Sequence, residues 1–246
     1  MFFFATFAPS RFQGDPVANY RELQAKGEYT MKLIAINGSP RKSWNTGTLL
    51  KKAIEGAQAV GAETELIHLY DLTYKGCTSC FACKMIDSPD MGRCAVKDDL
   101  TPVLKRIEDQ ADAVVLGTPV YFGSMSGELK SCMERLLFAP LVYSQPPRSL
   151  FPRKLRTAMI YTMNVPEEMS VQIGYQAMMT ATEASLKMIF GEAETLCSYD
   201  TYQFPDYSKV VMEHFDPEKK ALRRKEIFPA DCQKAFDLGQ RLVTKG

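Results

Sequence analysis

Residues 32–46 read Lys-Leu-Ile-Ala-Ile-Asn-Gly-Ser-Pro-Arg-Lys-Ser-Trp-Asn-Thr. The apolar run 32–36 predicts a short buried strand, and the Asn-Gly-Ser-Pro at 37–40 is a strong turn signal directly after it. Apolar residues then recur at helical spacing between residues 49 and 57, and Gly61 ends that pattern. A strand, a turn of small residues and a helix in this order favour the first unit of an α/β domain.

The alternation of strand and helix continues to the end of the chain. Further strands are predicted at 65–69, 113–116, 157–163 and 193–199, and further helices at 99–109, 129–137, 171–190 and 235–243. Five apolar strands separated by helices imply a parallel sheet covered on both faces, in a doubly wound, three-layer domain. We find no repeat and no low-complexity linker. We therefore expect one domain over residues 31–246, preceded by an N-terminal extension over residues 1–30.

Composition excludes several classes of function. The 246 residues are 46% hydrophobic, and 30 Lys and Arg balance 29 Asp and Glu. No broad field draws this chain to nucleic acid or to an acidic membrane. No run approaches the roughly 20 apolar residues of a membrane span, and the apolar start lacks the features of a secretory signal. We expect a cytoplasmic protein with no nucleic-acid partner and no membrane partner.

The turn after the first strand carries the first chemical signal. Small and hydroxyl residues there let backbone amides close on an anion, and the following helix adds the positive end of its dipole. Arg41 and Lys42 add charge, and the hydroxyls of Ser39 and Thr46 can bond phosphate oxygens. The sequence fits neither a Walker loop nor the Gly-x-Gly-x-x-Gly of dinucleotide folds. The alternative is an ordinary turn in which Thr46 caps the helix.

Four of the seven cysteines crowd into one segment, as Cys77, Cys80, Cys83 and Cys94. In a chain with no export signal, such crowding indicates metal or redox chemistry before it indicates disulfides. Four thiolates in a compact loop are what a 4Fe–4S cluster requires, whereas structural zinc sites usually present two separated pairs. The alternative is a set of reduced, partly buried cysteines that shape the loop.

Two loops of the chain resemble a known family. Residues 36–42, with Asn45 and Thr46, resemble the FMN-phosphate loop of the NAD(P)H-dependent FMN reductase and iron–sulfur flavoprotein superfamily. Residues 117–130 are similar to its second flavin loop, and residues 232–242 to its C-terminal helix. The resemblance implies a flavodoxin-like three-layer α/β sandwich, with a five-stranded parallel sheet in the order 2-1-3-4-5 and helices on both faces.

The resemblance also implies a role for particular residues. The FMN phosphate would be held by Ser39, Arg41, Asn45 and Thr46. The isoalloxazine would lie beside Pro119, Val120, Tyr121, Phe122 and Gly123, with Met163 and Asn164 on its other side. For Tyr121 and Phe122 the alternative is plain core packing. Trp44 and the extra spacing between Lys42 and Asn45 depart from the commoner form of the first loop.

The function implied is an FMN-dependent NAD(P)H oxidoreductase. Electrons would pass from the nicotinamide through FMN to a quinone, a flavin or another small acceptor. No side chain is required as an acid or base, because the flavin does the chemistry, so no catalytic residue is predicted. The resemblance implies a homodimer or homotetramer.

Two alternatives stay open. The first is an iron–sulfur flavoprotein that carries electrons, with a 4Fe–4S cluster on the Cys77–Cys94 loop and a ferredoxin-like partner. Without a cluster, the same cysteines would shape a lid over the flavin. The second alternative is a binding module of this fold that has lost its cofactor.

The remaining reactive residues have plainer interpretations. Cys132 lies on an apolar helical face and Cys197 in a strand, so both are predicted to be core residues. His68, at the end of a strand, is predicted to be structural. The basic run 219–225 is predicted to be a solvated face, with contact to NAD(P)H phosphate or to a partner subunit as the alternative.

Overall fold

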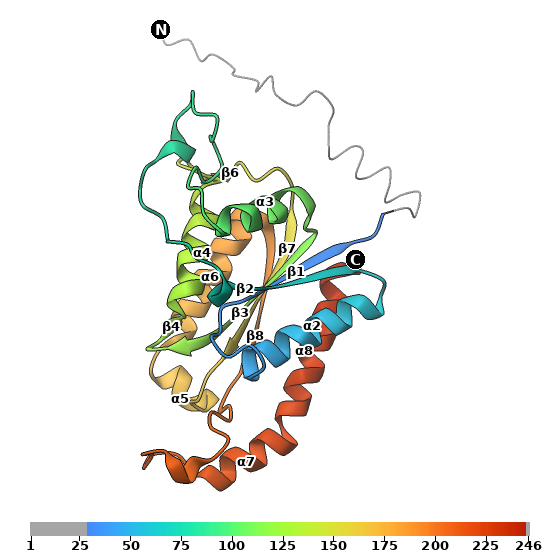
Figure 1. The fold of residues 1–246 in the computed structure, drawn as a ribbon, viewed down its shortest axis with the longest axis vertical. Helices are drawn as coiled ribbons and strands as arrows, with labels where there is room; N and C mark the ends of the chain where they lie inside the picture. The colour runs from blue at the N-terminus through green and yellow to red at the C-terminus, as the bar shows by residue number, and fades with distance from the viewer. Residues whose placement is uncertain (1–28, 245–246) are drawn as a thin grey trace. The chain divides into compact units, whose positions relative to one another are not determined.

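Five parallel strands form the central sheet of this computed structural model, which describes residues 29–244. The strands are β1 (Lys32–Asn37), β2 (Glu63–His68), β3 (Ala113–Tyr121), β7 (Leu155–Thr162) and β8 (Gly191–Ser198). Their spatial order is β2-β1-β3-β7-β8, as Figure 1 shows. Numbered along the chain, this is the predicted order 2-1-3-4-5, so the flavodoxin-like fold is confirmed. The extension predicted for residues 1–30 lies almost entirely outside the described residues.

Three short strands stand apart from this ladder. β4 (Ser124–Met125) folds back antiparallel on the end of β3, and β5 (Leu141–Val142) pairs with β6 (Arg148–Ser149) in a small hairpin. β3 runs well beyond the predicted 113–116, because residues 117–119 still pair with β7 and residues 120–121 pair with β4. β3 therefore carries its last residues past the edge of the sheet.

Helices cover both faces of the sheet. One face carries α2 (Asn45–Ala59) and α8 (Phe228–Val243), and the other carries α3 (Leu100–Gln110), α4 (Gly127–Phe138) and α6 (Tyr175–Phe190). Alternate residues of β1 enter the two cores: Leu33 and Ala35 face α2 and α8, while Ile34 and Ile36 face the other helices. None of the helices in the described part of the chain is long and apolar enough to cross a membrane.

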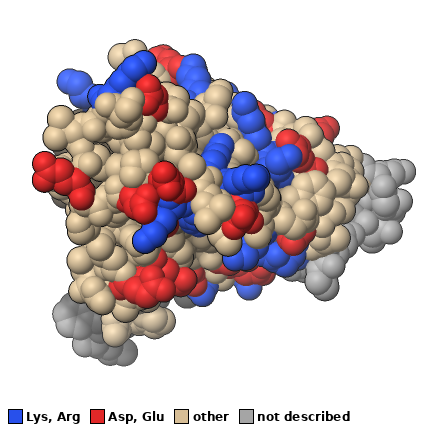
Figure 2. Space-filling model, turned by 90° about the horizontal axis from the view of Figure 1, so that it is seen from below, with Lys and Arg blue, Asp and Glu red and all other residues tan. Residues whose placement is uncertain are grey.

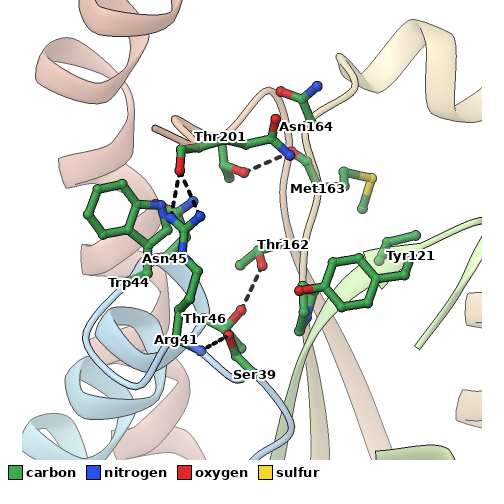
Figure 3. A pocket seen from close by; sticks show the side chains of 13 residues that line it. Ser39, Arg41, Trp44, Asn45, Thr46, Tyr121, Thr162, Met163, Asn164 and Thr201 are labelled. Carbon is green, nitrogen blue, oxygen red and sulfur yellow. Dashed lines mark hydrogen bonds between the residues drawn. The ribbon is translucent and has the colours of Figure 1, made fainter. Parts of the chain in front are cut away.

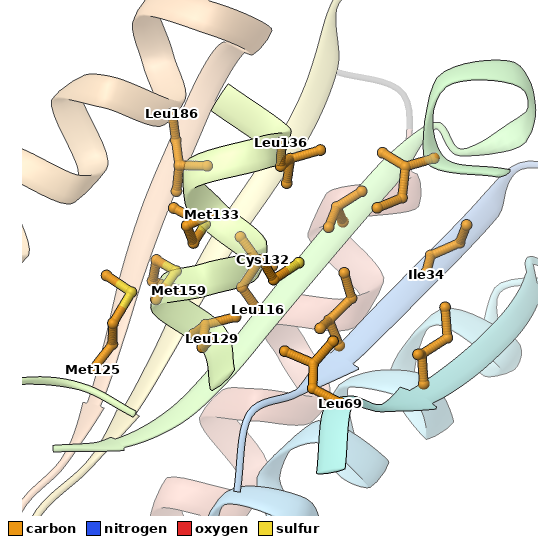
Figure 4. Close-up of a cluster of buried hydrophobic side chains, with 14 of the residues drawn as sticks. Ile34, Leu69, Leu116, Met125, Leu129, Cys132, Met133, Leu136, Met159 and Leu186 are labelled. Carbon is orange, nitrogen blue, oxygen red and sulfur yellow. The ribbon is translucent and has the colours of Figure 1, made fainter. Parts of the chain in front are cut away.

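The core beneath α4 is dense with branched and sulfur-containing side chains. Figure 4 shows Leu129, Cys132, Met133 and Leu136 of α4 pointing toward the sheet, where Leu116 of β3 meets them. All five side chains are buried. The prediction that Cys132 is a core residue is confirmed, and burial raises the pKa of its thiol to about 12. This thiol is therefore a packing group.

Two glycines let α2 and α8 touch backbone to backbone. A Cβ on Gly56 would lie 1.9 Å from the carbonyl oxygen of Phe236, and one on Gly239 would lie 1.8 Å from that of Ala53. Neither helix can move away without exposing the core that both cover. The absence of a side chain at these two positions therefore fixes the helix spacing.

We expect alanine at either glycine to destabilise the fold. Gly56→Ala and Gly239→Ala should each lower the free energy of unfolding by about 1–3 kcal/mol, the usual cost of overpacking. Urea denaturation followed by circular dichroism measures the loss. Lys51→Ala, on the exposed face of α2, is the matched control and should stay within about 0.5 kcal/mol of the wild type. Glycine variants as stable as this control would contradict the packing described.

Two helix predictions need correction. The single helix predicted at 171–190 is two helices, α5 (Glu167–Gln172) and α6, because Gly174 between them has φ +80°. α7 (Pro217–Glu226) was not predicted, since it is too polar to show an apolar period. Its local signal was Asp216-Pro217: the Asp216 carboxylate caps the amides of Glu218 and Lys219, and Pro217 occupies the first turn.

Candidate functional site

A pocket opens where the carboxyl ends of β1, β3 and β7 meet, which is where ligands bind in open α/β sheets. Figure 3 shows its side chains converging from the loops that follow these strands and from the segment after β8. The pocket is lined by Ser39, Arg41, Trp44, Asn45, Thr46, Pro119, Val120, Tyr121, Thr162, Met163, Asn164, Thr201 and Gln203. The structure thus brings together all the predicted cofactor contacts except Phe122 and Gly123.

Hydrogen bonds to neighbouring elements fix the backbone of the loop between β1 and α2. The amide of Gly38 donates to the carbonyl of Gly117 at 2.8 Å, and the hydroxyl of Ser126 donates to the carbonyl of Gly38 at 2.6 Å. The side-chain oxygen of Asn37 accepts the amide of Ser39 at 2.9 Å. The loop is therefore tied to β3 and to the start of α4 before any ligand binds.

Thr46 is a wall of the pocket rather than a helix cap. Its hydroxyl lies 2.7 Å from the hydroxyl of Thr162 on β7, and both side chains are buried. The residue before the first turn of α2 is Trp44, which makes no side-chain cap. The prediction of Thr46 as the cap of this helix is therefore wrong. The first amides of α2 lack such a cap, which suits an anion at this end of the helix.

Arg41 points toward the segment after β8. Both of its terminal nitrogens donate to the carbonyl of Gln203 at 2.7 Å, and its guanidinium lies 4.3 Å from the centre of the Trp44 ring. Trp44 and Asn45 donate to the carbonyl of Tyr202 at 2.9 and 2.8 Å. Trp44, the departure from the commoner family form, thus stacks on Arg41 and helps to close one side of the pocket.

The basic run at 219–225 is not simply a solvated face. Lys220 is only 2% exposed and donates to the carbonyl of Asn164 at 2.5 Å and to the carboxylate of Asp200. Arg224 donates to the side-chain oxygen of Asn45 at 2.7 Å. The prediction of a solvated face is wrong for these two residues, because each is hydrogen-bonded to a residue that lines the pocket. Figure 2 shows Lys and Arg interspersed with Asp and Glu across this side of the molecule.

Tyr121 and Phe122 are not core residues. Tyr121 is about half exposed and lines the pocket, whereas Phe122 is fully exposed. Phe122 and Gly123, with φ of 48° and 76°, form the tight turn between β3 and β4. The core-packing alternative is therefore wrong for both aromatic residues, and only Tyr121 reaches the pocket.

All four clustered cysteines line a second pocket. Its wall consists of Cys77, Thr78, Cys80, Phe81, Cys83, Cys94, Ala95, Val96, Arg135, Phe138 and Ala139. Cys83 is buried, Cys94 is half-buried, and the other two are exposed. Within the described residues, no three metal-binding side chains gather around a single point. In a 4Fe–4S cluster each thiolate binds a different iron, so the four sulfurs lie farther apart than around one metal ion, and thiols spread around one pocket suit a cluster better than a single ion.

The cysteine pocket is distinct from the first pocket and shares no residue with it. Ser126, at the start of α4, bonds the loop of the first pocket, while Phe138 at its end lines the second. The helix rises 1.5 Å per residue, so these two ends lie about 18 Å apart. The four cysteines therefore do not line the first pocket of the same chain.

Arg135 is the cation of the cysteine pocket. Its side chain is fully buried in α4 and donates to the sulfur of Cys94 at 3.2 Å and to the carboxylate of Asp98 at 2.6 Å. Burial acts to raise the pKa of Asp98, but the hydrogen bond and charge of Arg135 outweigh it and hold that pKa below its usual value. Sequence reasoning missed Arg135; its signal was a charged residue among the apolar positions of a predicted helix.

Two further sequence predictions concern His68 and Cys197. His68 lies 3.0 Å from the side-chain nitrogen of Asn37 on the neighbouring strand, which agrees with a structural role. Desolvation on burial is the main cause that lowers its pKa, so the neutral ring is favoured. Cys197 lies in β8 with its sulfur 3.5 Å from that of Met179, as expected of a packed residue.

Fold and site together define a flavodoxin-like α/β protein with a pocket at the carboxyl edge of its sheet. The comparisons with known proteins name the family. The profile of the NADPH-dependent FMN reductases matches residues 31–185, and the chain belongs to that family. The predicted resemblance is therefore confirmed, and with it the assignment to an FMN-linked oxidoreductase family.

Curated relatives cover part of the chain. The chain is 41% identical to an iron–sulfur flavoprotein of Methanocaldococcus jannaschii over 105 residues, and these residues make up 43% of this chain and 51% of that protein. The chain is 45% identical to an iron–sulfur flavoprotein of Archaeoglobus fulgidus over 105 residues, and these residues make up 43% of this chain and 48% of that protein. The matched stretch thus spans about half the length of these relatives.

Solved structures share the fold at low sequence identity. An NAD(P)H:quinone oxidoreductase from Methanothermobacter marburgensis superposes with a TM-score of 0.64 at 14% identity, over 87% of this chain and 100% of that one. An FMN-dependent NADH-azoreductase from Bacillus anthracis, in complex with FMN, gives 0.62 at 12% identity, over 88% and 100%. Both confirm the flavodoxin-like architecture.

Proposed function

We propose that this chain is an FMN-dependent NAD(P)H oxidoreductase that delivers electrons to a quinone, a flavin or another small acceptor. The observation that carries the proposal is the first pocket, where the loop before α2 meets the ends of β3 and β7. Ser39, Asn45 and Thr46 would hold the phosphate near the first turn of α2, and Arg41 would add positive charge. Family membership supports FMN as the cofactor.

The side of the pocket formed by the end of β3 and by the segment after β7 would accept an aromatic ring with a polar edge. Pro119, Val120 and Tyr121 would line one side of the ring, and Met163 and Asn164 the other. The side-chain oxygen of Asn164 is buried and has no hydrogen-bond partner within the described residues. A ligand N–H would satisfy this acceptor, which otherwise costs free energy to bury. FMN, when bound, would supply the hydride acceptor and the electron donor.

The test is anaerobic reduction of the FMN-loaded protein. We expect NADH or NADPH to bleach the flavin absorbance, and an added quinone to restore it. Uptake of FMN without reduction by either nucleotide would contradict the proposed oxidoreductase. Failure to take up FMN at all would instead support the binding module that has lost its cofactor.

A second function, electron carriage through a 4Fe–4S cluster, is favoured by the cysteine pocket. Cys77, Cys80, Cys83 and Cys94 supply the four thiolates, and the buried guanidinium of Arg135 offsets part of their negative charge. The names of the curated relatives also support a cluster. The cluster would supply one-electron transfer, so a small ferredoxin-like protein is the partner proposed for this role.

We also propose a single FMN-binding domain, a cytoplasmic location and a homo-oligomeric assembly. The family match begins at residue 31, which supports one FMN-binding domain over 31–246 preceded by an extension. All seven cysteines are free, which supports a reducing cytoplasmic location. A groove between α4 and α6, lined by Leu137, Met178 and Met188 among others, offers apolar surface for the proposed homodimer or homotetramer.

A further inference from the structure

Arg135 carries a charge in a place where an unpaired charge would be costly. Its side chain is fully buried, so every N–H needs an acceptor. One terminal nitrogen donates to Asp98 at 2.6 Å and to the carbonyl of Lys75 at 3.1 Å, and the other reaches the carbonyl of Val96 and the hydroxyl of Thr101, both at 3.4 Å. These oxygens hold the guanidinium plane in one orientation.

The remaining N–H of Arg135 has a different kind of acceptor. Its Nε donates to the sulfur of Cys94 at 3.2 Å. A neutral thiol is a weak acceptor, whereas a thiolate is a strong one for a charged donor. Glu134, the neighbouring acidic residue on α4, is occupied elsewhere, because its carboxylate accepts the amide of Cys77 at 3.2 Å. Only Asp98 pairs with Arg135 as a carboxylate within the described residues.

We propose that Arg135 is a positioning residue that orients Cys94 and raises the reduction potential of the 4Fe–4S cluster, with Asp98 setting how much of its charge the cluster experiences. This inference rests on the proposed cluster. It assigns to two residues outside the cysteine motif the tuning of that cluster's electronics. Neither residue is identified by the spacing of the cysteines.

The direction of each shift in the reduction potential follows from electrostatics. Reduction adds one electron, and so one negative charge, to the cluster. A buried positive charge and an N–H bonded to a ligand sulfur both stabilise the reduced form more than the oxidised form, which raises the potential. The carboxylate of Asp98 opposes this effect because it carries the opposite charge. Removing Arg135 should therefore lower the potential, and removing the charge of Asp98 should raise it.

The experiment compares four full-length proteins after anaerobic reconstitution with iron and sulfide. Wild type, Arg135→Gln, Asp98→Asn and Lys130→Gln are titrated with dithionite in the presence of mediators, and the reduced cluster is followed by electron paramagnetic resonance. Lys130→Gln is the matched control, since it removes one positive charge from the exposed side of the same helix. We expect the potential of Arg135→Gln to lie below that of wild type, that of Asp98→Asn to lie above it, and that of the control to be unchanged.

Opposite shifts are the decisive result, because loosened structure alone would move both variants in one direction or in neither. The inference is overturned when the two potentials equal that of wild type or shift in the same direction. Where Arg135→Gln binds no iron, the reduction potential of Asp98→Asn decides. A potential above that of wild type supports the inference, and an equal or lower potential overturns it. A wild type that takes up no iron and sulfide refutes the proposed cluster itself, which is a separate outcome.

Discussion

Replacing Gly47 by alanine is expected to weaken FMN binding about 10- to 100-fold. A Cβ at position 47 would lie 1.9 Å from the carbonyl oxygen of Lys42, which is backbone and cannot swing aside. The loop must therefore open to make room. Such overpacking costs about 1–3 kcal/mol, and each 1.4 kcal/mol taken from the bound state is a tenfold loss of affinity.

The measurement is the dissociation constant of FMN, obtained by quenching of its fluorescence, with circular dichroism to confirm that the variant is folded. Gly127→Ala is the control, because a Cβ at position 127 meets nothing within 4 Å. It should bind FMN as the wild type does. Equal affinity in Gly47→Ala would show that the loop before α2 does not hold the phosphate.

Replacing Cys83 by serine is expected to remove the iron and leave the flavin. Cys83 is the buried member of the cysteine pocket, and Gly92 donates its amide to the Cys83 carbonyl at 2.9 Å, which fixes its backbone. Serine lacks the thiolate that binds iron, so iron should fall from about four per chain to near zero. The first pocket shares no residue with this loop, so FMN content should not change.

Cys232→Ser is the matched control for this variant. Cys232 is half-buried and packs against the core on the face of the sheet that α2 and α8 cover. Its serine variant should keep both the iron and the flavin of the wild type. Iron retained in Cys83→Ser at the wild-type level would show that the cysteine loop is not the iron site.

The fold was accessible from the sequence because its central strands, β1, β3 and β7, are largely buried on both faces. Each then appears as an apolar run, and the turn at residues 37–40 marks the edge where ligands bind. The loops after β1, β3 and β7 were predicted for the same reason, since the carboxyl ends of parallel strands meet at one edge. The pocket residues with the clearest local signal, such as Ser39 and Pro119, were therefore found.

The residues that were missed act through partners far away in the sequence. Lys220 was assigned to a solvated face because its neighbours are charged, yet it is buried against Asp200 and the backbone of Asn164. Thr162 and Gln203 line the pocket through strand register and the course of one irregular segment. Arg135 meets Cys94 across 41 residues of sequence. No local pattern encodes such pairings, which are set by tertiary packing.

We propose a flavoprotein that holds FMN in the first pocket, with a cluster on the cysteine loop for its second function. The most direct test is the absorption spectrum of protein purified without oxygen, with FMN, iron and sulfide counted on the same sample. We expect flavin bands over broad brown absorbance, with about one FMN and about four irons per chain. A colourless protein that takes up neither added FMN nor iron would contradict it.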